Sequence, residues 1–429
     1  MLHQKLNNEF IRNVIILMTG TATAQAIPIL ISPLLTRLYS PEQFGIWALL
    51  MSIIGVLGVI ANGRYQHAIM LPDKKEDAAR VFYLSCIIAL CFSALLFLLY
   101  IYWKFFEVLH GAHDLHDSHG YKLLSDGYCF ILPFSILLVG IWQSLSVWQN
   151  RIKNYRLMAI GRITQAFVSS AVMLIFGYLE VEQGLLHGLL AGQLAIVLVL
   201  LSKDRPKNVE SSGILVKYAK KYSKFPIYDI WASLLNSISA HLPIIFFSYL
   251  FMVDQVGYYG LALKVMVIPV TLIGAAVSQV YYEKAAKTLA DTGNIFILTS
   301  KLYTRMIFIG VIPFGLVFLF GEFGFSLVFG ESWSAAGTIA KYMAIWLIFK
   351  FPYFCISTAY VIVQNFKFSL IFNICSFILQ ILVLVFCFMN KIDFLDAVLY
   401  FSIVNGVVYF IGSLVLLFTL KVMPCMKSS

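Results

Sequence analysis

Residues 19–49 read TGTATAQAIPILISPLLTRLYSPEQFGIWAL. An apolar stretch long enough to cross a bilayer is followed, after Arg37 and Pro41, by a second one. Pro28 and Pro33 stand inside the first stretch, although proline removes a backbone hydrogen bond and kinks a helix. Such residues are tolerated in a membrane helix where protein or a wet cavity satisfies the freed backbone groups. The stretch therefore predicts helices that pass through lipid and also face something other than lipid.

The rest of the chain continues this membrane pattern. Of its 429 residues, 60% are hydrophobic and 12% are charged, about half the charged fraction of a soluble protein. Apolar runs of about 20 residues recur along the chain, and each is long enough to span a bilayer as a helix. We expect an all-α integral membrane protein of about twelve transmembrane helices. The predicted spans are 12–35, 43–63, 81–103, 127–147, 157–179, 184–202, 228–251, 257–282, 304–329, 337–361, 369–389 and 397–420.

The 31 lysines and arginines are distributed unevenly between the two sides of the predicted membrane. If the N-terminus is cytoplasmic, 23 of them fall in cytoplasmic segments and four in outer segments. Positive charge accumulates on the cytoplasmic side of membrane proteins, so we expect both termini to lie there. The net charge of +10 is then a topology signal, and nucleic-acid binding is not expected.

The two halves of the chain share a weak repeat. IPILI at 27–31 and EQFGIWAL at 42–49 correspond to LPIIF at 242–246 and DQVGYYGL at 254–261. In each half, an acidic-Gln-apolar-Gly cluster is expected to open the next helix. Transporters are often built from repeats of this kind, with their site between the halves and in broken helices.

We therefore expect two six-helix lobes around a central cavity. The predicted N-terminal lobe is 1–202, the cytoplasmic linker is 203–227, and the C-terminal lobe is 228–429. Spans that face the cavity would bend at prolines as the lobes move, although static kinks are the alternative, because proline is common in membrane helices. The candidate hinges are Pro28, Pro33, Pro243 and Pro269.

Basic residues inside the predicted spans indicate the substrate's charge. A cation at the bilayer centre costs about 3 kcal/mol, and the spans offer few acidic partners. We expect a cationic cavity that favours an anionic substrate; snorkelling, interfacial anchoring and helix packing are the alternatives for individual residues. The candidate substrate-binding residues are Arg37, Arg64, Arg162, Lys264, Lys350, Gln25, Asn62, Asn236, His241 and Gln279.

Other motifs argue against an enzyme or a metal centre. HGAHDLHDSH at 110–119 places histidines three residues apart, but its glycines weaken a helix. We interpret it as a solvated outer loop, with a zinc or copper site as the alternative. The chain has no Gly-Lys pair, and so no phosphate-binding loop of the ATPase type, and it has no GxSxG motif. We expect no catalytic residues, no metal and no cofactor.

The N-terminal motifs resemble a known family. Residues 19–49, followed by GRYQHAIMLPDKKEDA at 63–78, are similar to the signature of the polysaccharide transporter family. Its members are Wzx-type O-antigen and lipid-linked oligosaccharide flippases of the multidrug/oligosaccharidyl-lipid/polysaccharide superfamily. Relatives often carry Glu where Gln66 stands, which puts an ion-coupling role at this position in doubt. The matching residues are Pro28, Pro33, Arg37, Tyr39, Pro41, Phe44, Gly45, Arg64, Tyr65, Leu71 and Pro72.

The resemblance implies both a fold and a function. It implies an inverted-V bundle that flips undecaprenyl-pyrophosphate-linked oligosaccharide from the cytoplasmic to the periplasmic leaflet of a bacterial inner membrane. The glycan would serve O-antigen, in lipopolysaccharide, or another surface polymer, with membrane lipids and other polysaccharide-assembly proteins as partners. Coupling to a proton or sodium gradient stays open. A multidrug or toxin exporter of the same superfamily is the first alternative, and a membrane glycan polymerase or ligase is the second.

Overall fold

The computed structural model describes residues 2–110, 128–206 and 212–422. All secondary-structure elements within these residues are helices, and twelve of the helices are long and apolar enough to cross a membrane. The predicted all-α class and the predicted number of spans are therefore confirmed. Several helices run well beyond the predicted spans: the eighth span was predicted to end at 282, whereas its helix continues to Thr292.

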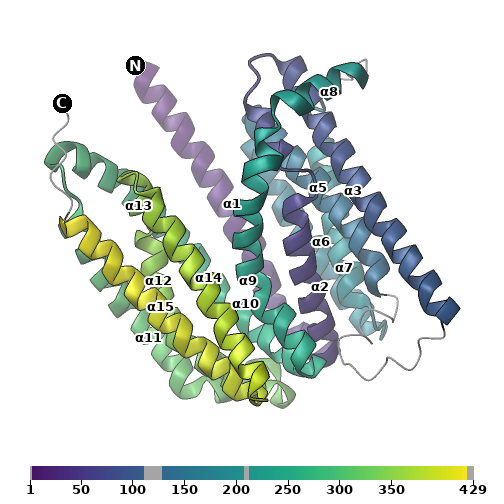
Figure 1. Ribbon diagram of the computed structural model, residues 1–429, viewed down its shortest axis with the longest axis vertical. Helices are drawn as coiled ribbons and strands as arrows, with labels where there is room; N and C mark the ends of the chain where they lie inside the picture. Colours follow the sequence, from purple (N-terminus) through teal and green to yellow (C-terminus); the bar gives the residue numbers. More distant parts are fainter. Residues whose placement is uncertain (1, 111–127, 207–211, 423–429) are drawn as a thin grey trace. The chain divides into compact units, whose positions relative to one another are not determined.

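The chain packs as two compact units, residues 1–257 and 258–429 (Figure 1). The predicted lobes are defined by a sequence repeat, whereas the two units are defined by packing. The six-plus-six division therefore stays a prediction. The long helices of the first unit are α1 (Leu2–Leu38), α2 (Pro41–Ile60), α3 (Lys75–His110), α5 (Ile131–Arg151), α6 (Tyr155–Tyr178), α7 (Gly184–Leu201) and α9 (Ile230–Leu250). Its shorter elements are η1 (Tyr65–Met70), η3 (Tyr128–Phe130), α8 (Ser212–Lys221) and a π-helical turn, η4 (Phe225–Asp229).

Helix α10 (Val253–Thr292) begins in the first unit and continues in the second. The second unit also contains α11 (Phe296–Phe329), η5 (Glu331–Trp333), α12 (Ser334–Ile356), α13 (Ala359–Ile362), α14 (Phe366–Met389) and α15 (Phe394–Val422). Helix α12 packs against both α11 and α15, and α15 also packs against α14. Large apolar side chains of α11, including Phe308, Ile312 and Leu319, are more than two-thirds exposed, as expected of a surface that faces lipid.

Small residues bring the helices of the first unit into close contact. Helix α7 packs on α6 along Gly188 and Gly192. A Cβ atom at Gly188 would lie 2.4 Å from Cγ of Met173, and one at Gly192 would lie 2.7 Å from Cβ of Ser169. In lipid, helix association relies on such close packing, because burying apolar surface away from apolar tails gains little.

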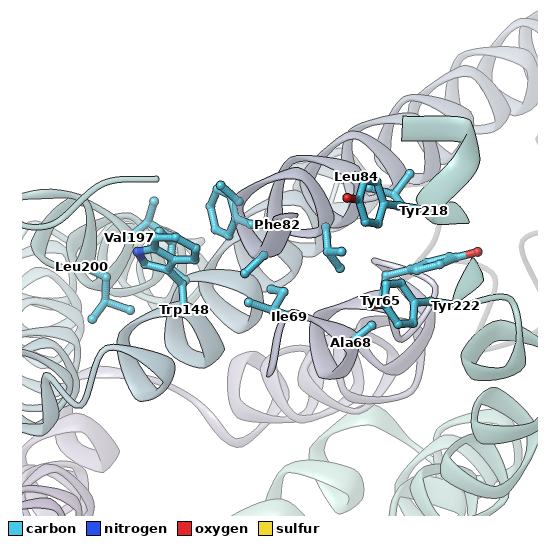
Figure 2. Close-up of a cluster of buried hydrophobic side chains, with 14 of the residues drawn as sticks. Tyr65, Ala68, Ile69, Phe82, Leu84, Trp148, Val197, Leu200, Tyr218 and Tyr222 are labelled. Atoms are coloured by element: carbon cyan, nitrogen blue, oxygen red, sulfur yellow. The ribbon is translucent and has the colours of Figure 1, made fainter. Parts of the chain in front are cut away.

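A buried apolar cluster, which we call the Trp148 cluster, joins α3, α5, α6, α7, η1 and α8 (Figure 2). Trp148 is fully buried, and its indole Nε1 donates a hydrogen bond to the carbonyl of Asp204 at 2.8 Å. On α8, Tyr218 lies within this cluster, and Tyr222, just beyond the helix, stacks on it with ring centroids 6.4 Å apart. The segment predicted as a linker therefore contains a helix that is packed onto the first unit.

The two repeated clusters both begin helices, as predicted. Ser40 caps α2: its Oγ accepts from the backbone N–H of Gln43, whose Oε1 accepts from the N–H of Ser40 at 2.8 Å. At the start of α10, the N–H of Met252 donates to Oε1 of Gln255 at 3.3 Å. In both halves the glutamine satisfies a backbone donor that the helix end leaves free.

The four candidate hinge prolines lie inside continuous helices: Pro28 and Pro33 in α1, Pro243 in α9 and Pro269 in α10. Pro33 cannot donate to the carbonyl of Ile29, and the Ser32 hydroxyl donates to that carbonyl instead, at 2.6 Å. A neighbouring hydroxyl thus satisfies one backbone group that proline frees in α1. The hinge role of these prolines stays a prediction.

Candidate functional site

The GRYQHAIMLPD segment forms a tight turn after α2. Gly63 and Arg64 both have left-handed backbone conformations, with φ of 58° and 63°, and the N–H of Tyr65 donates to the carbonyl of Asn62 at 3.1 Å. Arginine seldom adopts this conformation, so the surrounding contacts must hold it there. The turn is followed by η1, and the Arg64 side chain lies beside the start of α9.

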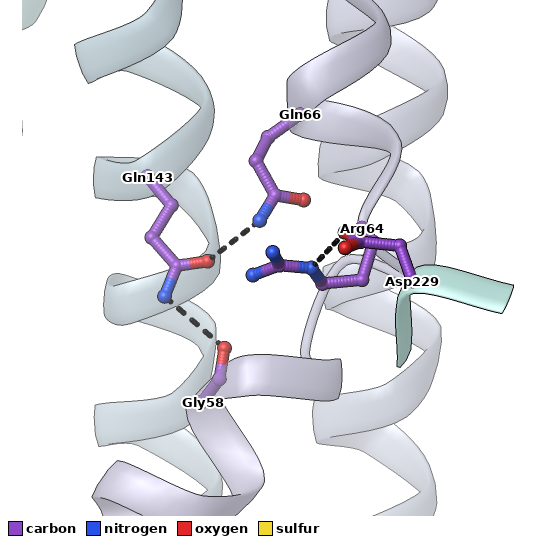
Figure 3. Close-up of polar contacts among 5 residues, drawn as sticks. All are labelled: Gly58, Arg64, Gln66, Gln143 and Asp229. Carbon is purple, nitrogen blue, oxygen red and sulfur yellow. Dashed lines mark hydrogen bonds and ion pairs between the residues drawn. The ribbon is translucent and has the colours of Figure 1, made fainter. Parts of the chain in front are cut away.

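Arg64 forms an ion pair with Asp229, the last residue of the π-helical turn before α9 (Figure 3). The Arg64 Nε and the Asp229 Oδ2 are 2.6 Å apart, and the two side chains are 18% and 39% exposed. Sequence reasoning placed both residues at span ends but did not predict that they meet. Asp229 therefore compensates the charge of one candidate substrate-binding cation in this conformation.

A chain of neutral amides lies beside this pair. Nε2 of Gln66 donates to Oε1 of Gln143 at 3.3 Å, and Nε2 of Gln143 donates to the carbonyl of Gly58 at 3.1 Å (Figure 3). Oε1 of Gln66 is buried and has no hydrogen-bond partner among the described residues. Gln66 is thus a neutral side chain that connects η1 to α5.

Asn62, in the turn after α2, also contacts α5. This fully buried side chain donates through Nδ2 to the carbonyl of Gly140 and to the Ser144 hydroxyl, at 3.2 and 3.3 Å. Both contacts are of the helix-packing kind that the sequence left open as an alternative to substrate binding.

Arg151, at the end of α5, contacts the other end of the same segment, where η1 ends. Its guanidinium donates to the carbonyls of Ile69, Met70, Pro72 and Asp73. Sequence reasoning missed this residue. The only signal was a basic residue at a span end, and its partners are backbone carbonyls that no side-chain pattern reveals.

Two other candidates lie where α1 packs on α6. Arg162 of α6 donates to the hydroxyl of Thr21 in α1. Gln25 lies one helical turn further along α1, and its Oε1 is buried without a hydrogen-bond partner among the described residues. Arg37, near the end of α1, is exposed. Arg162 thus joins α6 to α1 by a hydrogen bond. The substrate-binding roles of Arg162, Gln25 and Arg37 stay predictions.

The contact between α2 and α9 contains His241. A Cβ atom at Gly55 would lie 2.3 Å from Nε2 of His241, and the Ser237 hydroxyl donates to the carbonyl of Gly55 at 3.0 Å. Asn236, also on α9, is exposed. The His241 ring therefore fills a space that only a glycine on α2 leaves open.

In the second unit, Lys350 of α12 lies among aromatic rings. Its Nζ is 4.7 Å from the centroid of the Trp346 ring and 5.6 Å from that of Tyr409. Rings at these distances attract a cation electrostatically and offset part of its cost in an apolar setting. On α10, Lys264 is half-buried and Gln279 is exposed. The predicted substrate role of these three residues stays a prediction.

The histidine-rich stretch at 110–119 lies largely outside the described residues. Among the residues that the structure does describe, no group of three or more histidine, cysteine or acidic side chains could hold a metal ion.

Comparisons with known proteins agree with this architecture. A family model described as "Polysaccharide biosynthesis protein" matches residues 34–338. The teichuronic acid biosynthesis protein TuaB of Bacillus subtilis (strain 168) is 27% identical over 183 residues, which is 40% of this chain and 37% of that protein. The chain thus matches well under half the length of this relative.

Two solved transporters share the fold. The lipid II flippase MurJ, in an inward closed conformation, superposes with a TM-score of 0.70 at 18% identity, over 96% of this chain and 88% of that one. An inward-facing multidrug resistance transporter of the MATE family in the MOP superfamily gives 0.69 at 14% identity, over 94% and 95%. Since the family model covers most of the chain and extends the resemblance that residues 19–78 carry, the chain belongs to the polysaccharide biosynthesis protein family.

Proposed function

We propose that the protein flips a lipid-linked oligosaccharide across the membrane by alternating access. The observation that carries this proposal is the family match over residues 34–338, on a chain that has the fold of a lipid II flippase. The proposed substrate is undecaprenyl-pyrophosphate bearing a short oligosaccharide unit of O-antigen or another surface polysaccharide. It would move from the cytoplasmic to the periplasmic leaflet of a bacterial inner membrane, with both termini of the chain in the cytoplasm.

In this proposal Lys264, Lys350 and Arg64 attract the pyrophosphate. A phosphate oxygen about 4 Å from a lysine gains roughly 4 kcal/mol at an effective dielectric near 20. This is comparable to the cost of about 3 kcal/mol for a cation in the bilayer, so a bound anion would offset that cost. Arg64 would have to exchange Asp229 for the substrate. Such an exchange is accessible, since a partly exposed ion pair contributes about 1 kcal/mol or less.

The membrane potential can drive this transport without a cofactor. Moving one negative charge out of a negative-inside cell gains about 2.3 kcal/mol per 100 mV. A pyrophosphate with about two charges gains twice that if no counter-ion travels with it. A proton or sodium gradient is the other candidate source of energy.

The second candidate is a multidrug or toxin exporter, which the shared fold of the MATE transporter favours. An exporter of cationic drugs needs acidic side chains in its transport path. The predicted spans of this chain contain more basic than acidic residues. The acidic residue Asp229 of the candidate site is already paired with Arg64. The family and the transporter fold together support a transporter over a polymerase or ligase.

Leaflet exchange in liposomes tests the proposal. The purified chain would be reconstituted with fluorescent undecaprenyl-pyrophosphate oligosaccharide under an imposed negative-inside potential. Wild type is compared with Lys264→Ala and with Lys287→Ala, a control that removes an exposed lysine further along α10. We expect wild type and Lys287→Ala to exchange the lipid at similar rates, and Lys264→Ala to be at least about tenfold slower, which corresponds to a loss of about 1.4 kcal/mol.

Each other result has a defined meaning. If all three proteins exchange the lipid equally, the flippase stands and Lys264 is not a substrate contact. If none exchanges it, with or without a proton gradient, but a cationic dye is expelled, the exporter is supported and the flippase is wrong.

A further inference from the structure

A large pocket lies wholly within the second unit, away from Lys264 and Lys350. Its volume is about 980 Å³, and the helices α10, α11 and the end of α15 line it. Lys264 is more than three helical turns from the nearest lining residue of α10, and Lys350 lies on α12, which does not line the pocket. The pocket is thus distinct from the lysines of the proposed transport site, and Gln279, next to Val280, is the candidate residue beside it.

Four cations line this pocket: Lys284, Lys301, Arg305 and Lys421. Within the described part of the chain, none of the four forms an ion pair, and all four are exposed. No acidic residue is among the lining side chains. The pocket therefore presents uncompensated positive charge to whatever enters it.

The opposite end of the pocket is apolar. On α10, Ala276, Val277 and Val280 precede Lys284 along the helix, one to two turns away from it. Val280 is 69% exposed, so its side chain is available for contact. The chain turns at 293–295 between α10 and α11, which puts Lys284 and Arg305 at similar distances from that turn and the apolar residues of α10 further from it.

The walls of the pocket are held in place by hydrogen bonds. The Tyr281 hydroxyl and the Thr299 hydroxyl are 2.6 Å apart and join α10 to α11. Asn294, in the turn, donates through Nδ2 to the carbonyl of Leu420 at 3.2 Å and accepts from the N–H of Phe296 at 2.7 Å. The three lining elements are thus fixed to one another before any ligand binds.

We propose that this pocket binds an anionic amphiphile, with its phosphate group among the four cations and its hydrocarbon chain against Ala276, Val277 and Val280. The basic residues of this region lie on the side that the charge distribution assigns to the cytoplasm, where anionic headgroups attract lysine and arginine. A phosphate group on an apolar chain matches both ends of the pocket. Two sources share this chemistry: a phospholipid of the bilayer and a polyprenyl phosphate carrier. The inference does not depend on the proposed transport activity.

Native mass spectrometry of the full chain in detergent tests the proposal, with phosphatidylglycerol, phosphatidylcholine and undecaprenyl phosphate as probes. The test variant combines Lys284→Gln, Lys301→Gln and Arg305→Gln. The control variant, Lys287→Gln with Lys367→Gln and Lys391→Gln, removes the same charge from exposed residues of the second unit that do not line the pocket. Thermal unfolding checks that both variants are folded.

We expect phosphatidylglycerol to bind wild type and the control variant at least about tenfold more tightly than phosphatidylcholine does, and the test variant to lose this preference. The same pattern with undecaprenyl phosphate alone would support the pocket and identify the carrier as its ligand. If the triple variant does not fold, each single variant should still weaken binding roughly fivefold. Equal weakening in the test and control variants, or no preference for an anionic lipid in wild type, would overturn the proposal.

Discussion

Arg64 and Arg151 form different kinds of contact at the two ends of the segment 63–73. Arg64 is paired with a partly exposed carboxylate, an arrangement that contributes about 1 kcal/mol or less and leaves the guanidinium exchangeable. Arg151 instead donates to four backbone carbonyls. We infer that Arg64 is available for a substrate anion, whereas Arg151 fixes the segment that carries Arg64.

Arg151→Ala should therefore lower the stability of the protein. The loss removes charge-assisted hydrogen bonds to backbone groups, and we expect a decrease of about 2 kcal/mol in the free energy of unfolding. The free energy of unfolding of Arg151→Lys should lie between those of wild type and Arg151→Ala. An ammonium group lacks the planar fork with which a guanidinium reaches several carbonyls together. Thermal unfolding in detergent, followed by tryptophan fluorescence, measures both.

Arg156→Ala is the matched control, since this arginine is exposed near the start of α6. Its unfolding midpoint should match that of wild type. An unchanged midpoint for Arg151→Ala would show that the four carbonyl contacts do not stabilise the turn.

At the scale of elements, the repeated helix starts lie against one another. A Cβ atom at Gly45 would lie 1.9 Å from the carbonyl oxygen of Val253, and one at Gly257 would lie 1.9 Å from that of Pro41. All four residues belong to the first unit. The contact is reciprocal, as a duplication predicts: each glycine admits the backbone that opens the other helix.

Gly45→Ala should consequently be destabilising, although alanine favours helices. A methyl group at this distance from a carbonyl forces the two helix starts apart, and we expect a loss of about 1–3 kcal/mol. Gly315→Ala, inside α11, has no atom within 4 Å of its added methyl group and should raise stability by up to about 1 kcal/mol. Unfolding midpoints in detergent that move the same way for both variants would contradict the packing argument.

At the scale of the whole molecule, the distribution of basic residues predicts the orientation of the chain in the membrane. The positive-inside rule assigns 23 of the 31 basic residues to one side of twelve confirmed spans. The same asymmetry gathers the basic residues of the second-unit pocket on the side assigned to the cytoplasm. The orientation of the protein and the ligand class of this pocket are therefore linked.

Cysteine labelling tests this orientation. In a background without native cysteines, Glu182→Cys should react with a membrane-impermeant maleimide in intact cells, because 180–183 is a predicted outer loop. Lys203→Cys should react only after permeabilisation, because it begins the predicted cytoplasmic loop. Both side chains are exposed, so access to the reagent depends on the side of the membrane. The reverse pattern would overturn the predicted topology and the cytoplasmic placement of both termini.

The sequence alone determined the helical class, the number of spans, the clusters at 42–49 and 254–261 that open helices, and the family. These follow from local properties, because a run of about 20 apolar residues or a capping cluster acts within its own segment. It also identified Arg64 and Lys350 as cations of interest. It could not identify their neighbours, since partners such as Asp229 and Tyr409 lie on other helices.

Only the tertiary structure decided which side chains meet. The Arg64–Asp229 pair, the Gln66–Gln143 contact and the carbonyls around Arg151 depend on which helix faces pack together. The same is true of the pocket in the second unit, whose four cations come from three helices. Hydropathy makes a segment cross the membrane but does not set its rotation about its own axis. That rotation is fixed by close packing between helices, and it decides which of their polar groups come within reach of one another.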